Sequence, residues 1–199
     1  MITQLADELK KHKLVKPVIV LGAGPSMQKY VHDRQYFKNM RSRSDQPFVV
    51  IGVNWVFKNF DVDYNVVTHN EPIIEISKNG MDCPLVYSRL TGDVGYAALN
   101  YKADGIVFEP FEELWCGQST IIAALHLATK INPMRAWVAG VDLTLDAKRG
   151  MYYDGYVMGG EGRKRPSDTH FLCWAEVVRK QINGLSNMTG CKFLQYGPK

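Results

Sequence analysis

The sequence predicts an α/β fold, a three-layer sandwich in which helices cover both faces of a mostly parallel sheet. Short apolar runs rich in valine and isoleucine alternate along the chain with longer segments of helical periodicity. Several of these runs stop abruptly at glycine, asparagine or aspartate, as buried parallel strands do. The chain has 199 residues, of which 46% are hydrophobic, so we expect a single domain spanning residues 1–199.

Strands are expected where apolar and β-branched residues follow one another without a polar interruption. The expected ranges are Val18–Leu21, Phe48–Val53, Tyr64–Val67, Leu85–Ser88, Gly105–Phe108, Ala136–Val141 and Lys192–Leu194.

Helices are expected between these runs and at the N-terminus. Thr3–Lys13 is amphipathic, and Gln28–Met40 is polar and partly helical. Ser119–Lys130 is the clearest helix, because it opens with Ser and Thr and ends before an Asn-Pro pair. Asp168–Leu185 carries apolar residues at helical spacing and is the last long helix.

The segment Leu143–Pro166 breaks this alternation. It is long, rich in glycine and basic, and it holds three tyrosines. Connections of this length in a compact domain are usually either functional lids or disordered segments, and the tyrosines and basic residues favour the lid. We therefore expect a lid that closes over a ligand, just before the last helix.

Composition limits the possible partners and compartments. The net charge of +4 suits an anionic ligand without requiring nucleic acid. The four cysteines form no CxxC pair, so they are expected to be free thiols in a reducing, cytoplasmic compartment, with no zinc site. Neither a signal peptide nor an apolar run near the roughly 18 residues of a membrane span is visible.

The turn Gly22-Ala-Gly-Pro-Ser26 follows the first buried strand directly. Its glycines, Gly22 and Gly24, allow a tight turn whose backbone N–H groups can approach a phosphate, and Ser26 adds a hydroxyl. The third glycine of a dinucleotide fingerprint and the Gly-Lys-Ser/Thr ending of a P-loop are both missing. A purely structural strand-to-helix turn is the alternative interpretation.

Other strands also end in polar residues, and ligands of open α/β sheets bind beyond the carboxyl ends of the strands. Asn54, Asn70 and Asp142 each follow an expected strand, and Ser119 opens the clearest helix. Asparagine offers both a donor and an acceptor to a base, a ribose or a sugar hydroxyl. Helix capping is the alternative role for Asn54, Asn70 and Ser119.

Two histidines are candidate general bases. His170 lies in the first turn of the last helix, after the basic run Arg163-Lys-Arg165. His69, in the loop after a strand, is the rival. Arg163 and Arg165 either contact a phosphate or belong to a solvated loop.

The order of these motifs, roughly from Pro17 to Leu194, resembles the bacterial sialyltransferases of glycosyltransferase family 42. The wider related group includes the 6-hydroxymethylpterin diphosphokinase-like proteins. The resemblance implies a variant GT-A, Rossmann-like fold that uses a CMP-sugar donor without a metal ion. It also implies that the donor meets the turn at Gly22, Gly24 and Ser26.

The same resemblance implies roles for residues further along the chain. Asn54 and Asn70 would hold the nucleotide and sugar, and Ser119 the cytidine. Tyr152 or Tyr153 would contact the donor phosphate, and His170 is similar to the catalytic histidine. The chain departs from the family where Ala23 replaces an asparagine and where Trp115-Cys116 replaces an arginine.

The leading functional hypothesis is a glycosyltransferase that moves a sugar from a nucleotide-sugar donor to a hydroxyl of a glycan or of a modified nucleic-acid base. The second is a Mg²⁺-dependent diphosphokinase that acts on a small heterocyclic alcohol, with Asp142, Asp146 and Asp154 as carboxylates for the metal. A nucleotide-binding module without catalysis is the third. A homo-oligomer is compatible with each of them.

Overall fold

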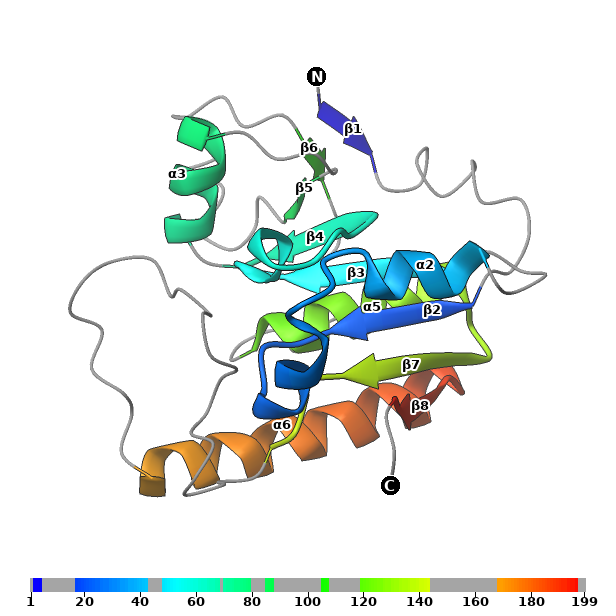
Figure 1. The fold of residues 1–199 in the computed structure, drawn as a ribbon. Helices are drawn as coiled ribbons and strands as arrows, with labels where there is room; N and C mark the ends of the chain where they lie inside the picture. The colour runs from blue at the N-terminus through cyan, green and yellow to red at the C-terminus, as the bar shows by residue number, and fades with distance from the viewer. Residues whose placement is uncertain are drawn as a thin grey trace.

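A parallel β-sheet forms the centre of the computed structural model, which describes residues 2–4, 17–42, 48–68, 70–79, 85–87, 105–107, 119–143 and 168–196 (Figure 1). In this described part of the chain the sheet has eight strands, in the order β1-β6-β5-β4-β3-β2-β7-β8. Every neighbouring pair is parallel. The predicted α/β fold class is therefore confirmed.

The strands of the sheet are short. Their bounds are β1 Ile2–Gln4, β2 Val18–Leu21, β3 Val49–Val53, β4 Tyr64–Val67, β5 Leu85–Tyr87, β6 Gly105–Val107, β7 Arg135–Ala139 and β8 Lys192–Gln195.

The helices are α2 Tyr36–Ser42, α3 Asn70–Asn79, α5 Thr120–Ile131 and α6 Asp168–Thr189, with two short 3-10 segments, η1 Pro25–Tyr30 and η2 Val56–Lys58. α5 packs against β2, β3, β4 and β7, and also against α6. α2 covers the opposite face of the sheet, in front of the strands in Figure 1. The structure thus has the three layers that the sequence predicts.

The order in which the chain adds strands to the sheet changes side at β2. Strands β3, β4, β5 and β6 are added in turn on one side of β2, and β7 and β8 lie on its other side. Open α/β sheets generally bind their ligands beyond the carboxyl ends of the two strands at such a switch point, here β2 and β7.

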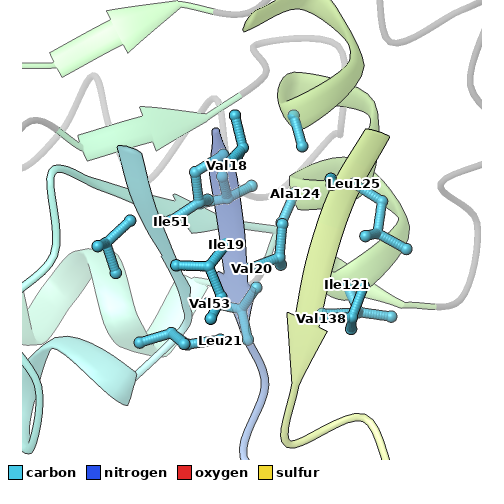
Figure 2. Packing of buried hydrophobic residues seen from close by; sticks show 14 of the residues in the cluster. Val18, Ile19, Val20, Leu21, Ile51, Val53, Ile121, Ala124, Leu125 and Val138 are labelled. Atoms are coloured by element: carbon cyan, nitrogen blue, oxygen red, sulfur yellow. The ribbon is translucent and has the colours of Figure 1, made fainter. Parts of the chain in front are cut away.

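The core is built around β2, whose four side chains are all completely buried. Figure 2 shows this strand between its neighbours, with Ile121, Ala124 and Leu125 of α5 packed beside it. A strand covered on both faces has no solvent side, and this explains the unbroken apolar run in the sequence. Burial of this kind stabilises the fold by about 25 cal/mol per Å² of apolar surface. The packed core therefore holds the ends of the strands in fixed positions.

The structure confirms the predicted bounds of β2 and β4 and shifts those of the other predicted strands by one or two residues. The prediction of a helix over Thr3–Lys13 is wrong at its start, because Thr3 and Gln4 belong to β1. That strand forms by pairing Ile2 with Gly105, a contact that local periodicity does not report. The rest of that predicted helix, like the expected lid after Leu143, lies outside the described residues.

Helix α3 was not expected from the sequence, although Glu71 and Pro72 in its first turn are typical of a helix start. Glu75 of this helix accepts a hydrogen bond from the indole of Trp55 at 2.8 Å and forms an ion pair with Lys58. These contacts attach α3 to the segment that follows β3. The middle of α3 is thereby held close to the residues that follow β3.

Within the described residues, none of the helices combines the length and the apolar character that crossing a bilayer requires. Cys191 is a buried free thiol and Cys173 an exposed one, as expected, while Cys83 and Cys116 lie outside the described residues.

We predict that stability depends on pH through His126, a buried residue of α5. Desolvation, followed by the charge of Lys130, lowers the pKa of His126 from 6.5 to about 4. The unfolded chain takes up this proton more readily, so the stability is present above about pH 6.5 and is lost as the pH falls toward about 4.

Urea unfolding at a series of pH values tests this prediction. The variant His126→Gln should lose less stability than the unmodified protein between about pH 7 and 4, by of order 2–3 kcal/mol. The exposed His32, replaced in the same way, is the matched control. Parallel pH profiles of His126→Gln and the unmodified protein would contradict the prediction.

Candidate functional site

The carboxyl ends of β2, β3, β4 and β7 lie at one edge of the sheet (Figure 1). The first turn of α6 lies on the same side, at the left of the view. The polar strand ends that the sequence predicts to converge are therefore brought together. They form two hydrogen-bonded groups, one between β2 and β7 and one among β3, β4 and α5.

The first group joins the turn after β2 to the turn after β7. The backbone N–H of Gly22 donates to the carbonyl of Ala139 at 2.7 Å, and that of Gly24 donates to the carbonyl of Gly140 at 2.8 Å. The N–H of Ser26 donates to Oδ2 of Asp142 at 2.8 Å. The aspartate carboxylate is thereby fixed beside the glycine turn, at the switch point of the sheet.

These bonds correct the expectation of a ready phosphate nest. The N–H groups of Gly22, Gly24 and Ser26 are all engaged within the protein, and Pro25 has none. A carboxylate, which repels phosphate, stands beside the turn instead. The turn therefore offers the Ser26 hydroxyl and the oxygens of Asp142, a surface suited to ligand hydroxyl and amino groups.

The glycines of the turn are needed for close packing of the main chain. A Cβ on Gly24 would overlap Oδ2 of Asp142 and lie 2.8 Å from the carbonyl oxygen of Gly140. A Cβ on Gly22 would lie 2.9 Å from the Gly140 carbonyl carbon. Gly140 has φ +71°, a conformation that side chains disfavour, and a Cβ there would overlap Met27. The structural interpretation of the turn thus accounts for its glycines.

The second group centres on Asn54, the residue after β3. Thr120 Oγ1, in the first turn of α5, donates to Asn54 Oδ1 at 3.2 Å. Thr120 Oγ1 also lies 2.5 Å from the hydroxyl of Thr68, the residue after β4. These side-chain hydrogen bonds connect the carboxyl ends of β3 and β4 to the start of α5.

The backbone of Asn54 is held as firmly as its side chain. It has φ +49°, a left-handed conformation that asparagine tolerates better than most residues. Its N–H donates to the carbonyl of Val66 at 2.9 Å, and its carbonyl accepts from Nδ2 of Asn65 at 2.8 Å. Asn54 caps no helix, since the N-cap of η2 is Trp55. The alternative role of Asn54 as a cap is therefore wrong.

Ser119 performs the capping role that was its alternative interpretation. It is the N-cap of α5, is buried, and accepts a hydrogen bond from the N–H of Ile121 at 3.4 Å. Its neighbour Thr120 carries the contact to the strand ends instead.

Several predicted site residues are placed only in part or lie outside the described residues. Asn70 is the first residue of α3 and His170 is in the first turn of α6, but their side chains are not described. The backbone of Leu143 is described, with φ +49°, and its carbonyl accepts a hydrogen bond from Arg179 of α6. The predicted residues outside the described ranges are His69, Tyr152, Tyr153, Arg163, Arg165, Asp146 and Asp154.

The structure adds residues that sequence reasoning did not select. Thr120 and Asn65 are buried polar residues of the second group, and Gly140 forms the second turn of the first. The signal available for Asn65 was an amide inside a buried strand, which requires a partner. Over the described ranges, no three or more His, Cys, Asp or Glu side chains are placed to hold a metal ion.

Comparison with known proteins gives a structural likeness only. No family model matches the chain, and no curated protein matches it in sequence. The fold is similar to that of the monofunctional α-2,3-sialyltransferase Cst-I from Campylobacter jejuni, with a TM-score of 0.54 and 12% sequence identity. The match covers 91% of this chain and 75% of that one, and it supports a sialyltransferase-like fold.

We predict that Gly24→Ala destabilises the fold by about 2 kcal/mol or more, because the added Cβ forces apart the two turns. Gly184→Ala is the matched control, since nothing lies within 4 Å of a Cβ built on this helical glycine. That change should stabilise α6 by about 0.5–1 kcal/mol. Denaturant unfolding measures the stability of both variants. Equal stability of Gly24→Ala and the unmodified protein would contradict the predicted overlap of the added Cβ with Asp142 and Gly140.

Proposed function

We propose that the protein is a glycosyltransferase that binds a CMP-sugar-like donor at the strand ends and transfers the sugar, without a metal ion, to a hydroxyl acceptor. One observation carries the proposal: polar groups follow the carboxyl ends of β2, β3, β4 and β7 at one edge of the sheet, beside its switch point. A buried core has no need of such groups at one edge. The likeness in fold to a sialyltransferase supports the same activity.

The chemistry of the two turns favours the sugar or base part of a nucleotide beside Asp142. The carboxylate keeps lone pairs for ligand donors after it accepts the Ser26 N–H. Ribose hydroxyls or a cytosine amino group can donate to them. The phosphate of the donor then belongs further from this carboxylate, and Tyr152, Tyr153, Arg163 and Arg165 are its proposed partners.

The proposed reaction needs one base and a stabilised leaving group. The acceptor hydroxyl gives its proton to a histidine, and its oxygen forms a bond to the anomeric carbon of the donor sugar. The bond between that carbon and the phosphate oxygen breaks, and the nucleoside monophosphate leaves with the electron pair. His170 is our first candidate for the base, because α6 begins at the edge where the strands end (Figure 1).

The predicted effect of losing the base is a loss of turnover without a loss of binding. His170→Ala should lower turnover by about 10²–10⁴ and leave donor affinity unchanged, since a general base acts on the acceptor. His69→Ala should have the smaller effect. The measurement is release of nucleotide from a CMP-sugar in the presence of acceptor glycans or nucleic acid.

The opposite ranking of the two variants would make His69 the base. Full activity of both variants would contradict the proposed mechanism. A protein that binds the donor but never releases nucleotide would be a binding module without catalysis.

The diphosphokinase hypothesis retains one candidate carboxylate in the described site, Asp142, which already accepts a backbone N–H. That reaction requires Mg²⁺, so removal of metal separates the two functions. Transfer activity that survives EDTA supports the glycosyltransferase. Activity that is abolished by EDTA and restored by Mg²⁺ supports the diphosphokinase.

We predict that CMP and CMP-sugars stabilise the protein against heat. A ligand at 100 times its dissociation constant adds about 2.7 kcal/mol, which is roughly 5–10 °C in Tm for a chain of this size. Pyrophosphate is the control, and it should give a smaller shift because the N–H groups of Gly22, Gly24 and Ser26 are engaged. Equal shifts with pyrophosphate and CMP would contradict the nucleoside part of the proposal.

A further inference from the structure

We infer that Asn54 is a dedicated hydrogen-bond donor to the ligand, and that Thr120, Thr68 and Asn65 are positioning residues that set this polarity. The inference rests on the proposed function and deepens it, because it names the kind of ligand atom that Asn54 takes.

A hydroxyl has a single proton to donate. Thr120 Oγ1 gives its proton to Asn54 Oδ1, so in the short contact with Thr68 the proton must come from Thr68. The chain of donation therefore runs from Thr68 to Thr120 to Asn54. It ends on the amide oxygen of Asn54, so the amide NH₂ is the end of this side chain that remains for a ligand.

The exposure of Thr120 and Asn54 agrees with this direction. Thr120 is buried, with 4% of its surface exposed, whereas Asn54 is half-buried at the edge of the sheet. Among the described residues, the NH₂ of Asn54 has no hydrogen-bond partner, while its Oδ1, N–H and carbonyl each have one. A ligand that meets this group must offer an acceptor, such as a phosphate, carboxylate or pyrimidine carbonyl oxygen.

Asn65 fixes the backbone from which this amide projects. Its Nδ2 donates to the Asn54 carbonyl, and this bond assigns the orientation of the Asn65 amide, because a carbonyl cannot donate. The other end of the amide, Oδ1, is completely buried and has no partner within the described structure. A buried oxygen without a hydrogen-bond partner lowers the stability of the fold. We infer that Asn65 is kept for the hydrogen bond that its Nδ2 donates to the Asn54 carbonyl.

The strand beside β4 is also adapted to Asn65. Gly52 of β3 stands directly opposite Asn65 in the sheet register. A Cβ on Gly52 would lie 3.0 Å from Asn65 Oδ1. The small residue leaves room for the amide within a strand otherwise made of valine and isoleucine.

The two groups of the site thus have opposite polarity. Asp142 presents acceptor oxygens to ligand donors, and Asn54 presents a donor to a ligand acceptor. A nucleotide carries both kinds of atom, with hydroxyl donors on its ribose and acceptor oxygens on its base and phosphate. The polarity also predicts that a carboxylate cannot replace the amide at position 54.

The experiment compares CMP affinity, measured by calorimetry, across matched variants. Asn54→Asp keeps an acceptor for Thr120 but removes the NH₂ group, and it should weaken CMP binding by at least about tenfold. Thr120→Val removes the hydroxyl that orients the amide and should weaken binding by about three- to tenfold. Thr120→Ser restores the hydroxyl and should bind CMP within about twofold of the unmodified protein.

Thr129→Val is the matched control for Thr120→Val. Thr129 is a buried threonine of the same helix, and its hydroxyl donates to the carbonyl of His126 at 2.8 Å. The same loss of a hydroxyl there should leave CMP affinity unchanged. Equal losses of affinity in Thr120→Val and Thr129→Val would show a general effect on stability and overturn the inference.

A readout without ligand separates the inference from the proposed function. In ¹H–¹⁵N spectra of the free protein, Thr120→Val should shift the side-chain NH₂ signals of Asn54, and Thr129→Val should not. An Asn54 signal unmoved by Thr120→Val, or full CMP affinity of Asn54→Asp, would overturn the inference. Absence of CMP binding by the unmodified protein would instead contradict the proposed function.

Discussion

The close approach of two turns, one after β2 and one after β7, is the constraint on which the rest of the site depends. At the switch point the chain leaves β2 in one direction and returns to its other side through β7. The main chain at Gly140 then passes so near Gly22 and Gly24 that neither has room for a side chain. Three hydrogen bonds join the two turns and fix the Asp142 carboxylate beside the glycine turn. The same packing that joins β7 to β2 therefore fixes the position of the Asp142 carboxylate.

A second constraint acts one strand further along, where polar groups are buried at a cost. Asn65 keeps an unsatisfied amide oxygen inside the sheet, and Asn54 adopts a left-handed backbone. Each feature costs of order 1–3 kcal/mol. A fold selected for stability alone would place apolar residues there, as it does throughout β2. The helix start at Thr120 joins these groups into one network, and the burial of α5 against the sheet holds that network in place.

The sequence predicted the features that depend on neighbours along the chain. The strand ranges of β2 and β4, the cap at Ser119 and the polar ends Asn54 and Asp142 all follow from local pattern. Features set by distant contacts were missed or misjudged. The N–H groups after β2 seemed free for phosphate, but they bond to a turn more than a hundred residues away. Thr120 reads as an ordinary helix start until the fold brings Asn54 and Thr68 to it.

Under the proposed function, the charge of a nucleotide ligand is met by a different part of the chain from the part that fixes its orientation. Within the described residues, the strand ends contribute a carboxylate and neutral amides and hydroxyls, and their backbone donors are largely engaged. Groups of this kind discriminate between donors and acceptors on a ligand, but they do not neutralise a phosphate. The basic residues Arg163 and Arg165 come later in the sequence, before α6. A nucleotide bound at this edge would draw its specificity from the strand ends and its charge compensation from that basic segment. Salt separates the two contributions, because it screens the attraction between the phosphate and the basic side chains but not the hydrogen bonds at the strand ends.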